Sequence, residues 1–163
     1  MKSNLNNSDA YRFLSIKALP ILSAIVEANG FKYVKPSSQP KSTISDIIFK
    51  FRDSYKKLIE TSPTIYYPEF DSIAISLHKM MYCKHILFVK DNKVYIISQE
   101  SLLSIWNNKD ICKIDRQHYQ DGLGERAQMS RIDINWAMEN ASYVLKMNEE
   151  HANKYHSALK DIL

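Results

Sequence analysis

Two of the three glycines in this chain of 163 residues lie close together in the stretch DGLGERAQMSR, residues 121–131. Gly122 and Gly124 can take positive φ angles that other residues avoid, so the stretch predicts first of all a turn. The exposed backbone N–H groups of such a turn also form an anion nest, and Arg126 and Arg131 lie beside it to pair with a phosphate or a carboxylate. The dinucleotide-binding and P-loop motifs are absent, because neither GxGxxG nor GxxxxGK[ST] occurs in the sequence.

Histidines, cysteines and acids are spread along the chain without the spacing of a metal site or a catalytic set. His151 and His156 are five residues apart, which turns them to different sides of a helix. Cys83 and Cys112 are the only cysteines and are too far apart in the sequence for a CxxC motif. The motifs GxSxG and HExxH do not occur. We therefore assign no catalytic residue, metal ligand or cofactor, and an enzyme ranks behind two kinds of binding protein.

Residues 43–61 are predicted to form a helix with one apolar and one basic face. Thr43 and Asp46 resemble a capping box, and the apolar side chains that follow keep a helical spacing. Phe49 falls on the basic face of that helix, where another segment can cover it or where it can stack on a nucleic-acid base. The candidate residues for contact with nucleic acid or a protein partner are Lys41, Phe49, Lys50, Arg52, Lys56 and Lys57.

The distribution of charge supports a nucleic-acid partner. The chain carries 22 Lys and Arg against 18 Asp and Glu, which gives a net charge of +4 and an isoelectric point near 8.9. Residues 1–60 hold ten of the bases and five of the acids, so the first third is the basic part. A basic surface attracts phosphates, although a pI of this size does not by itself identify a nucleic-acid-binding protein.

Length and composition predict a single domain over residues 1–163. A hydrophobic content of 45% provides enough apolar side chains for a core. The apolar run over residues 13–28 is interrupted by Lys17 and Pro20, which argues against a signal peptide. No uncharged apolar run reaches the length of about 18 residues that a membrane span needs. We expect a cytoplasmic protein with reduced cysteines and no membrane partner.

The order of elements predicts an α+β fold with N-terminal helices, a β-hairpin with one or two further strands in a small sheet, and a long C-terminal helix. The first helix should begin at Ser8 or Asp9, kink or break at Pro20, and end at Asn29-Gly30. The Pro- and Ser-rich residues 34–42 should form a loop before the helix over residues 43–61.

The middle of the chain predicts the hairpin. Residues 68–83 fit a helix or a strand, and we favour the helix because its apolar pattern is longer. The stretch HILFVKDNKVYIIS, residues 85–98, has two apolar runs around Asp91-Asn92, which is typical of a hairpin. The remaining expected elements are a short helix over 98–106, strands within 111–114 and 128–134, and a helix from Asn135 to the end that also offers a homodimer surface.

The order helix, hairpin, helix and strand over about residues 68–116 resembles the core of the PD-(D/E)XK nucleases. That family holds Mg²⁺ with an Asp and with an E-x-K motif on the second strand of the hairpin. The corresponding stretch here is Ile97-Ser98-Gln99-Glu100-Ser101, and no lysine follows two residues after Glu100. The resemblance therefore implies a degenerate version that binds nucleic acid without cleaving it.

Two functions follow from these features. The first is a non-catalytic binder of nucleic acid that uses the basic first third, and the predicted helices before the hairpin also permit a winged-helix docking. The second is a small regulator or inhibitor that binds a protein partner through Phe49, the glycine loop or the C-terminal helix. Counterion release distinguishes the two, because salt weakens binding to nucleic acid far more than binding at an apolar protein interface.

Overall fold

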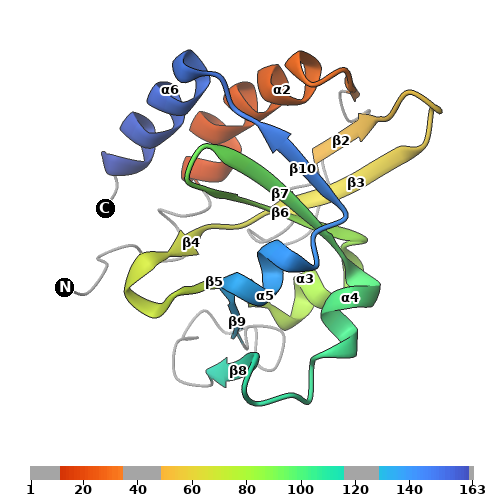
Figure 1. Ribbon diagram of the computed structural model, residues 1–163, viewed down its shortest axis with the longest axis vertical. Coiled ribbons are helices and arrows are strands. Elements are labelled where there is room, and N and C mark those ends of the chain that lie inside the picture. Colours follow the sequence, from red (N-terminus) through yellow and green to blue (C-terminus); the bar gives the residue numbers. More distant parts are fainter. Residues whose placement is uncertain (1–11, 35–48, 116–128, 162–163) are drawn as a thin grey trace.

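Two β-sheets form the centre of the protein, and helices cover them (Figure 1). The computed structural model describes residues 12–34, 49–115 and 129–161. The larger sheet contains, in spatial order, β1 (Lys32–Val34), β2 (Phe49–Arg52), β3 (Leu58–Pro63), β6 (His85–Lys90), β7 (Lys93–Ser98) and β10 (Tyr143–Lys146). The smaller sheet contains β4 (Tyr66–Tyr67), β5 (Ser72–Ser76), β9 (Met129–Asp133) and β8 (Cys112–Asp115). The α+β prediction is confirmed, but the prediction of one small sheet is wrong.

Strand pairing is antiparallel throughout these sheets except between β3 and β6, which run parallel. A parallel pair needs a long crossover connection. Here the crossover contains β4, a 3₁₀ turn η2 (Pro68–Phe70), β5 and helix α3 (Leu77–Tyr82). The chain thus leaves the larger sheet, builds two strands of the smaller sheet and returns, so that neither sheet is continuous in sequence.

The N-terminal helix changes its winding at the proline. A π-helical segment η1 (Phe13–Ala18) leads without a break into α2 (Leu19–Ala28), and Pro20, which has no N–H to donate, is the second residue of α2. The helix ends where the sequence predicts, at Asn29, and Gly30 follows with a φ of 88°. The side-chain amide of Asn29 then bonds both backbone groups of Lys146 in β10.

The core consists of two apolar clusters, one on each face of the larger sheet. The first joins η1, α2 and α6 (Glu149–Lys160) to the strands, and includes Phe13, Ile25, Phe49, Phe51, Leu87, Ile96 and Tyr155. The second lies between the larger sheet and the smaller one and includes Ile73, Ile75, Ile86, Phe88, Ile97 and Ile132. Successive residues of β6 point alternately into the two clusters, which explains why its apolar run has no polar alternation.

The predicted helix over residues 43–61 is wrong for the residues that the structure describes. Residues 49–52 and 58–63 form strands β2 and β3, which pair as a hairpin, and residues 43–48 lie outside the described part. Apolar and basic residues alternate in β2, as they do in a half-buried strand: Phe49, Lys50, Phe51 and Arg52. Burial of the two phenylalanine rings against α2 and β1 stabilises the strand over the helix.

The choice of a helix for residues 68–83 is also wrong over most of its length. Residues 72–76 form the strand β5, whose Ile73 and Ile75 are buried against the larger sheet, and only residues 77–82 are α-helical. Ser76 separates the two, because its side chain accepts the backbone N–H of Lys79 and so caps α3. The stretch that resembles the first helix of the nuclease core is therefore a strand followed by a short helix.

The predictions for residues 85–134 agree with the structure in most of their parts, while the predicted helix start at Ser8 or Asp9 and residues 35–42 of the predicted loop lie outside the described residues. The hairpin of β6 and β7 turns at Asp91-Asn92, and the helix α4 (Gln99–Ser104) and the strands β8 and β9 lie in the expected stretches. The C-terminal helix is present as α6 and begins at Glu149. Before it, residues 134–139 form the short helix α5 (Ile134–Glu139) and residues 143–146 form β10, which adds an edge strand beside β7.

Candidate functional site

The structure divides the predicted binding residues between the core and an exposed turn. Phe49 is 0% exposed, and its ring stacks on that of Tyr33 at a centroid distance of 5.2 Å. The prediction that it belongs to a contact face is therefore wrong, because it lies on the buried side of a strand and not on a helix. Lys50 and Arg52 point to the opposite side of β2, while Lys41 lies outside the described residues.

Lys56 and Lys57 belong to the turn between β2 and β3, which we call the hairpin tip, residues 53–57. A carboxylate oxygen of Asp53 accepts the backbone N–H groups of Tyr55 at 2.9 Å and of Lys57 at 2.8 Å. The backbone of Asp53 also bonds Lys57 O and Lys56 N, and Lys56 takes a left-handed φ of 65°. These bonds fix the conformation of the tip.

Tyr55 is the residue that the hairpin tip displays. Its side chain is 90% exposed, and Arg52 approaches the same turn, since its Nη1 donates to Lys56 O at 3.2 Å. An exposed aromatic ring thus belongs to the same turn as Lys56 and Lys57, and Arg52 is bonded to that turn. Helical spacing would place Tyr55 on the buried, apolar face, so the sequence did not predict its exposure. The signal for a turn is the polar pair Asp53-Ser54 between two apolar stretches.

Other bases surround this end of the larger sheet. Lys32 on β1 lies directly across from Arg52 in the strand register. Lys57 and Lys84 are close enough to His85 to lower the pKa of its imidazole, although burial is the main cause of that shift. The one acid on β3, Glu60, is 4.0 Å from Lys50. Asp53 keeps its negative charge, but Arg52, Lys56 and Lys57 outnumber it, so the net charge at the hairpin tip is positive.

The predicted anion loop cannot be assembled from the described residues, because Gly122, Gly124 and Arg126 lie outside them. Arg131 lies on β9, and its guanidinium carbon is 4.8 Å from the ring centroid of Phe70. The Nε atom of Arg131 is buried and has no hydrogen-bond partner within the described ranges. Stacking on Phe70 orients this arginine, but no second cation of the predicted loop is placed beside it.

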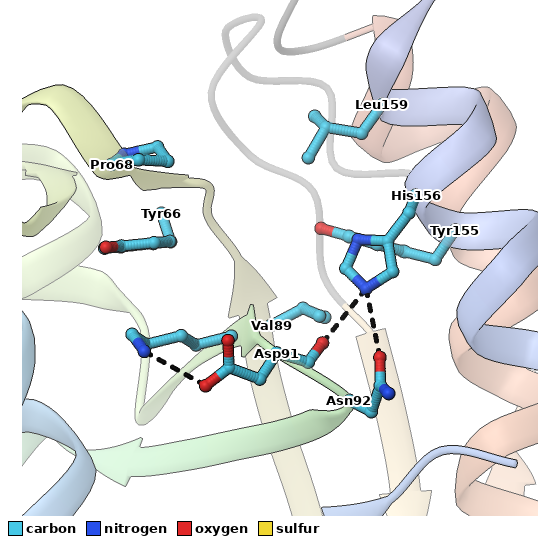
Figure 2. A pocket seen from close by; sticks show the side chains of 9 residues that line it. Tyr66, Pro68, Val89, Asp91, Asn92, Tyr155, His156 and Leu159 are labelled. Atoms are coloured by element: carbon cyan, nitrogen blue, oxygen red, sulfur yellow. Dashed lines mark hydrogen bonds and ion pairs between the residues drawn. The ribbon is translucent and has the colours of Figure 1, made fainter. Parts of the chain in front are cut away.

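A cavity of about 440 Å³ lies between the β6–β7 turn, β4 and α6 (Figure 2). Its wall on the side of β4 consists of Tyr66 and Pro68, and α6 contributes the opposite wall. The complete lining is Tyr66, Pro68, Val89, Lys90, Asp91, Asn92, Tyr155, His156 and Leu159. A volume of this size is typical of sites for small molecules.

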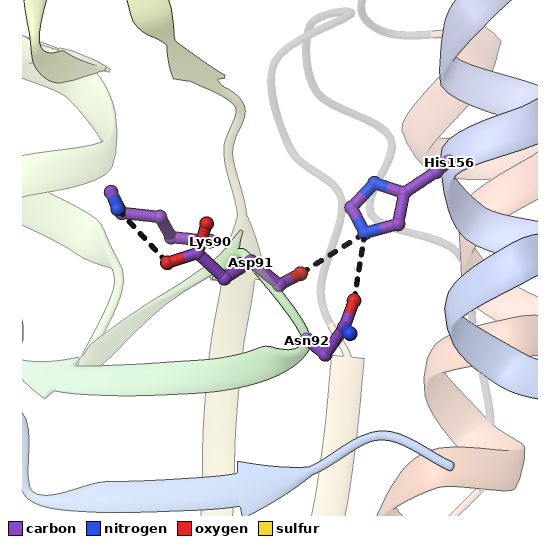
Figure 3. Close-up of polar contacts among 4 residues, drawn as sticks. All are labelled: Lys90, Asp91, Asn92 and His156. Carbon is purple, nitrogen blue, oxygen red and sulfur yellow. Dashed lines mark hydrogen bonds and ion pairs between the residues drawn. The ribbon is translucent and has the colours of Figure 1, made fainter. Parts of the chain in front are cut away.

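Polar contacts fasten the floor of this cavity to α6 (Figure 3). His156 Nε2 donates to the backbone oxygen of Asp91 at 3.0 Å and lies 3.3 Å from Asn92 Oδ1. Both acceptors are oxygens without hydrogens, so the proton resides on Nε2. Lys90 Nζ pairs with Asp91 Oδ2 at 3.1 Å and lies 5.6 Å from the centroid of the Tyr66 ring. Burial is the main cause that raises the pKa of Tyr66.

Tyr155 contributes the most deeply buried polar group of the cavity. The residue is 3% exposed, its ring meets Phe13 edge-on at 5.4 Å, and burial raises the pKa of its phenol far above the ordinary value. Figure 2 shows its hydroxyl pointing away from α6 into the cavity. None of the hydrogen bonds found between described residues involves this hydroxyl, and burial is the one cause of its raised pKa.

The described residues contain neither a metal-binding cluster nor a membrane-spanning helix. Within residues 12–34, 49–115 and 129–161, no three His, Cys, Asp or Glu side chains lie close enough together to hold a metal ion. No helix of the described part is long and apolar enough to cross a membrane. Comparisons with protein-family models, curated proteins and solved structures find no match to this chain.

Proposed function

We propose that this protein is a non-catalytic nucleic-acid-binding protein that contacts its partner with the hairpin tip. The observation that supports the proposal is the exposure of Tyr55, whose ring is held in solvent by a turn built on Asp53. A ring that is 90% exposed in its own protein buries apolar surface when it stacks on a base, which lowers the free energy of binding. Base–aromatic stacking is worth about 1–3 kcal/mol per base.

The charges around the ring suit a phosphate backbone. Arg52, Lys56 and Lys57 surround Tyr55, and Lys32 lies across from Arg52 on the neighbouring strand. The nearest acid, Asp53, has a carboxylate oxygen that already accepts two backbone N–H groups. Single-stranded nucleic acid fits this surface best, because its bases are free to stack on a protruding ring while the bases of a duplex are not.

Charge reversal at the tip tests the proposal. The double substitution Lys56→Glu and Lys57→Glu should weaken binding of a fluorescent single-stranded oligonucleotide and leave the melting temperature nearly unchanged, because exposed side chains contribute within about 0.5 kcal/mol to stability. Tyr55→Ala should weaken binding by about tenfold through loss of stacking. Fluorescence anisotropy at low salt measures both effects.

The matched control reverses two exposed lysines far from the tip. Lys109→Glu and Lys113→Glu change the net charge equally at β8, which lies at the opposite end of the molecule in Figure 1. Affinity should be retained in this variant. Binding that falls equally in both double variants would show a general charge effect, and binding unaltered by Tyr55→Ala would contradict the role of the tip.

A protein partner is the second candidate, and an exposed apolar surface favours it. Met81 and Tyr82 at the end of α3 and Leu103 on α4 are all exposed. The two helices are joined because Gln99 Nε2 donates to the backbone oxygens of Met80 and Met81. A salt titration separates the candidates: with three phosphates neutralised, log affinity should fall with log salt at a slope of about −2 for single strands, whereas an apolar interface changes much less.

A further inference from the structure

The cavity of Figure 2 is lined by one positive and one negative side chain, and this pair limits the charge of a ligand that the cavity can bind. Lys90 and Asp91 carry opposite charges and form an ion pair with each other at 3.1 Å. The ammonium group of Lys90 also occupies the face of the Tyr66 ring. A cationic ligand would compete with Lys90 for Asp91, and an anionic ligand would have to draw Lys90 from its partner. The cavity therefore suits an uncharged ligand.

Two polar atoms are nevertheless directed into the cavity without a partner in the described structure. One is the hydroxyl of Tyr155, on a side chain whose residue is 3% exposed. The other is the second carboxylate oxygen of Asp91, on a side chain that is 82% exposed, so that solvent reaches it. This oxygen points into the cavity in Figure 2, while Oδ2 pairs with Lys90. A carboxylate only accepts hydrogen bonds, and a phenol both accepts and donates. The ligand must then offer at least one N–H or O–H donor.

The walls favour a flat ligand. Pro68 and the ring of Tyr66 on one side face Leu159 and the ring of His156 on the other, with Val89 at the base. His156 cannot turn away easily, because its Nε2 is bonded to the β6–β7 turn. Proline and leucine side chains and aromatic rings pack well against the faces of a ring, while the donors of such a ring lie at its edge, where Asp91 and Tyr155 are found.

We propose that this cavity binds an uncharged, amino-substituted heteroaromatic ring, the chemical class to which adenine, guanine and cytosine belong. An amino group donates to the free oxygen of Asp91, and a ring nitrogen or a second N–H bonds the hydroxyl of Tyr155. The cavity lies at the β6–β7 turn and not at the hairpin tip, so this proposal does not depend on the proposed nucleic-acid surface.

Isothermal titration calorimetry with pairs of nucleosides tests the proposal. Adenosine should bind more tightly than purine riboside, and guanosine more tightly than inosine, because the second member of each pair lacks the amino group. Tyr155→Phe should weaken adenosine binding by about tenfold, which corresponds to ~1.4 kcal/mol and is within the usual worth of a buried hydrogen bond. The variant should fold normally, because the hydroxyl that it loses makes no hydrogen bond to the described residues.

Tyr33→Phe is the matched control, because it removes a hydroxyl from a partly buried tyrosine that packs on Phe49 far from the cavity. Its affinity for adenosine should equal that of the parent. Asp91→Gly tolerates the φ of 56° at this position, removes both carboxylate oxygens and should abolish the preference for amino-bearing nucleosides. Absence of nucleoside binding, tighter binding of benzoate or benzylammonium, or unchanged affinity in Tyr155→Phe would each overturn the proposal.

Discussion

At the scale of single residues, His85 is the side chain whose charge affects stability most directly. Burial is the main cause that lowers the pKa of its imidazole. A hydrogen bond to the backbone of Glu60 opposes this shift as the next largest contribution, and the charges of Lys57 and Lys84 lower the pKa further. Its Nδ1 atom is buried and has no partner within the described part of the chain. The folded protein therefore favours the neutral ring, and a proton on His85 favours unfolding.

The stability of the protein should accordingly decrease in mild acid. An unfolded histidine titrates near pH 6.5, so the contribution of His85 is complete above about pH 6.5 and is lost as the pH falls toward the lower folded pKa. Each unit of difference between the two pKa values is worth about 1.4 kcal/mol at most. Urea unfolding from about pH 7 to about pH 5 measures this loss. His85→Leu should flatten the profile, and an equally steep profile in this variant would assign the effect to other groups.

The sequence predicted an exposed Phe49, whereas the structure exposes Tyr55, and this difference illustrates what the sequence could and could not predict about the site. The basic residues Arg52, Lys56 and Lys57 were identified because charge is visible without a fold. Which aromatic ring is exposed beside them depends on whether the residues form a helix or a strand. The strand β2 buries Phe49, and the turn after it exposes Tyr55. The cavity could not be predicted, because it joins segments brought together only by the packing of α6 on the β6–β7 hairpin.

At the scale of elements, Gly30 has a function in ending the N-terminal helix. Its φ of 88° is disfavoured for side chains with a Cβ, yet nothing lies within 4 Å of the place where that Cβ would be. Gly30→Ala should therefore cost only the backbone strain, about 1 kcal/mol. Gly30→Asn should cost less, because Asn tolerates positive φ. Chemical denaturation measures the unfolding free energy of both variants. If Gly30→Ala and Gly30→Asn lost equal amounts, the loss would have a cause other than backbone conformation.

Turn-forming and helix-ending residues were sufficient to predict some elements from the sequence, whereas other elements depend on strands that are distant in the sequence. The β6–β7 hairpin was predicted because Asp91-Asn92 forms a turn between adjacent strands, and the helix end at Asn29-Gly30 was predicted from the residue types alone. Strands β2 and β5 were interpreted as helices because their neighbouring residues fit both periods. Their partners decide the outcome: β5 pairs with β9, which is far away in the sequence.

At the scale of the whole molecule, the two apolar clusters share the strands of the larger sheet. Ile86 and Leu87 are adjacent in β6 but point into different clusters. Ile86→Ala and Leu87→Ala should each cost about 2–5 kcal/mol as large-to-small core substitutions. Trp106 and Trp136 pack only against the second cluster, the one that contains Ile86. Tryptophan fluorescence therefore reports unfolding from one side of the sheet.

Both substitutions should shift the same tryptophan transition, because a strand cannot remain ordered on one face alone. A matched shift in Leu87→Ala, whose side chain lies on the face opposite the tryptophans, would show that the clusters unfold together as one domain. A tryptophan transition that moves with Ile86→Ala and stays in place with Leu87→Ala would instead reveal two units that unfold separately.

The amide of Asn29 has a consequence for aggregation. Strand β10 is at the edge of the larger sheet, where unpaired backbone groups are a template for strands of other molecules. At Lys146 the Asn29 side chain donates to the backbone oxygen at 2.9 Å and accepts the backbone N–H at 3.2 Å, as the peptide group of an adjoining strand would. A foreign strand must displace this amide before it can pair along the end of β10, so a single side chain protects part of the edge against the growth of the sheet into neighbouring molecules.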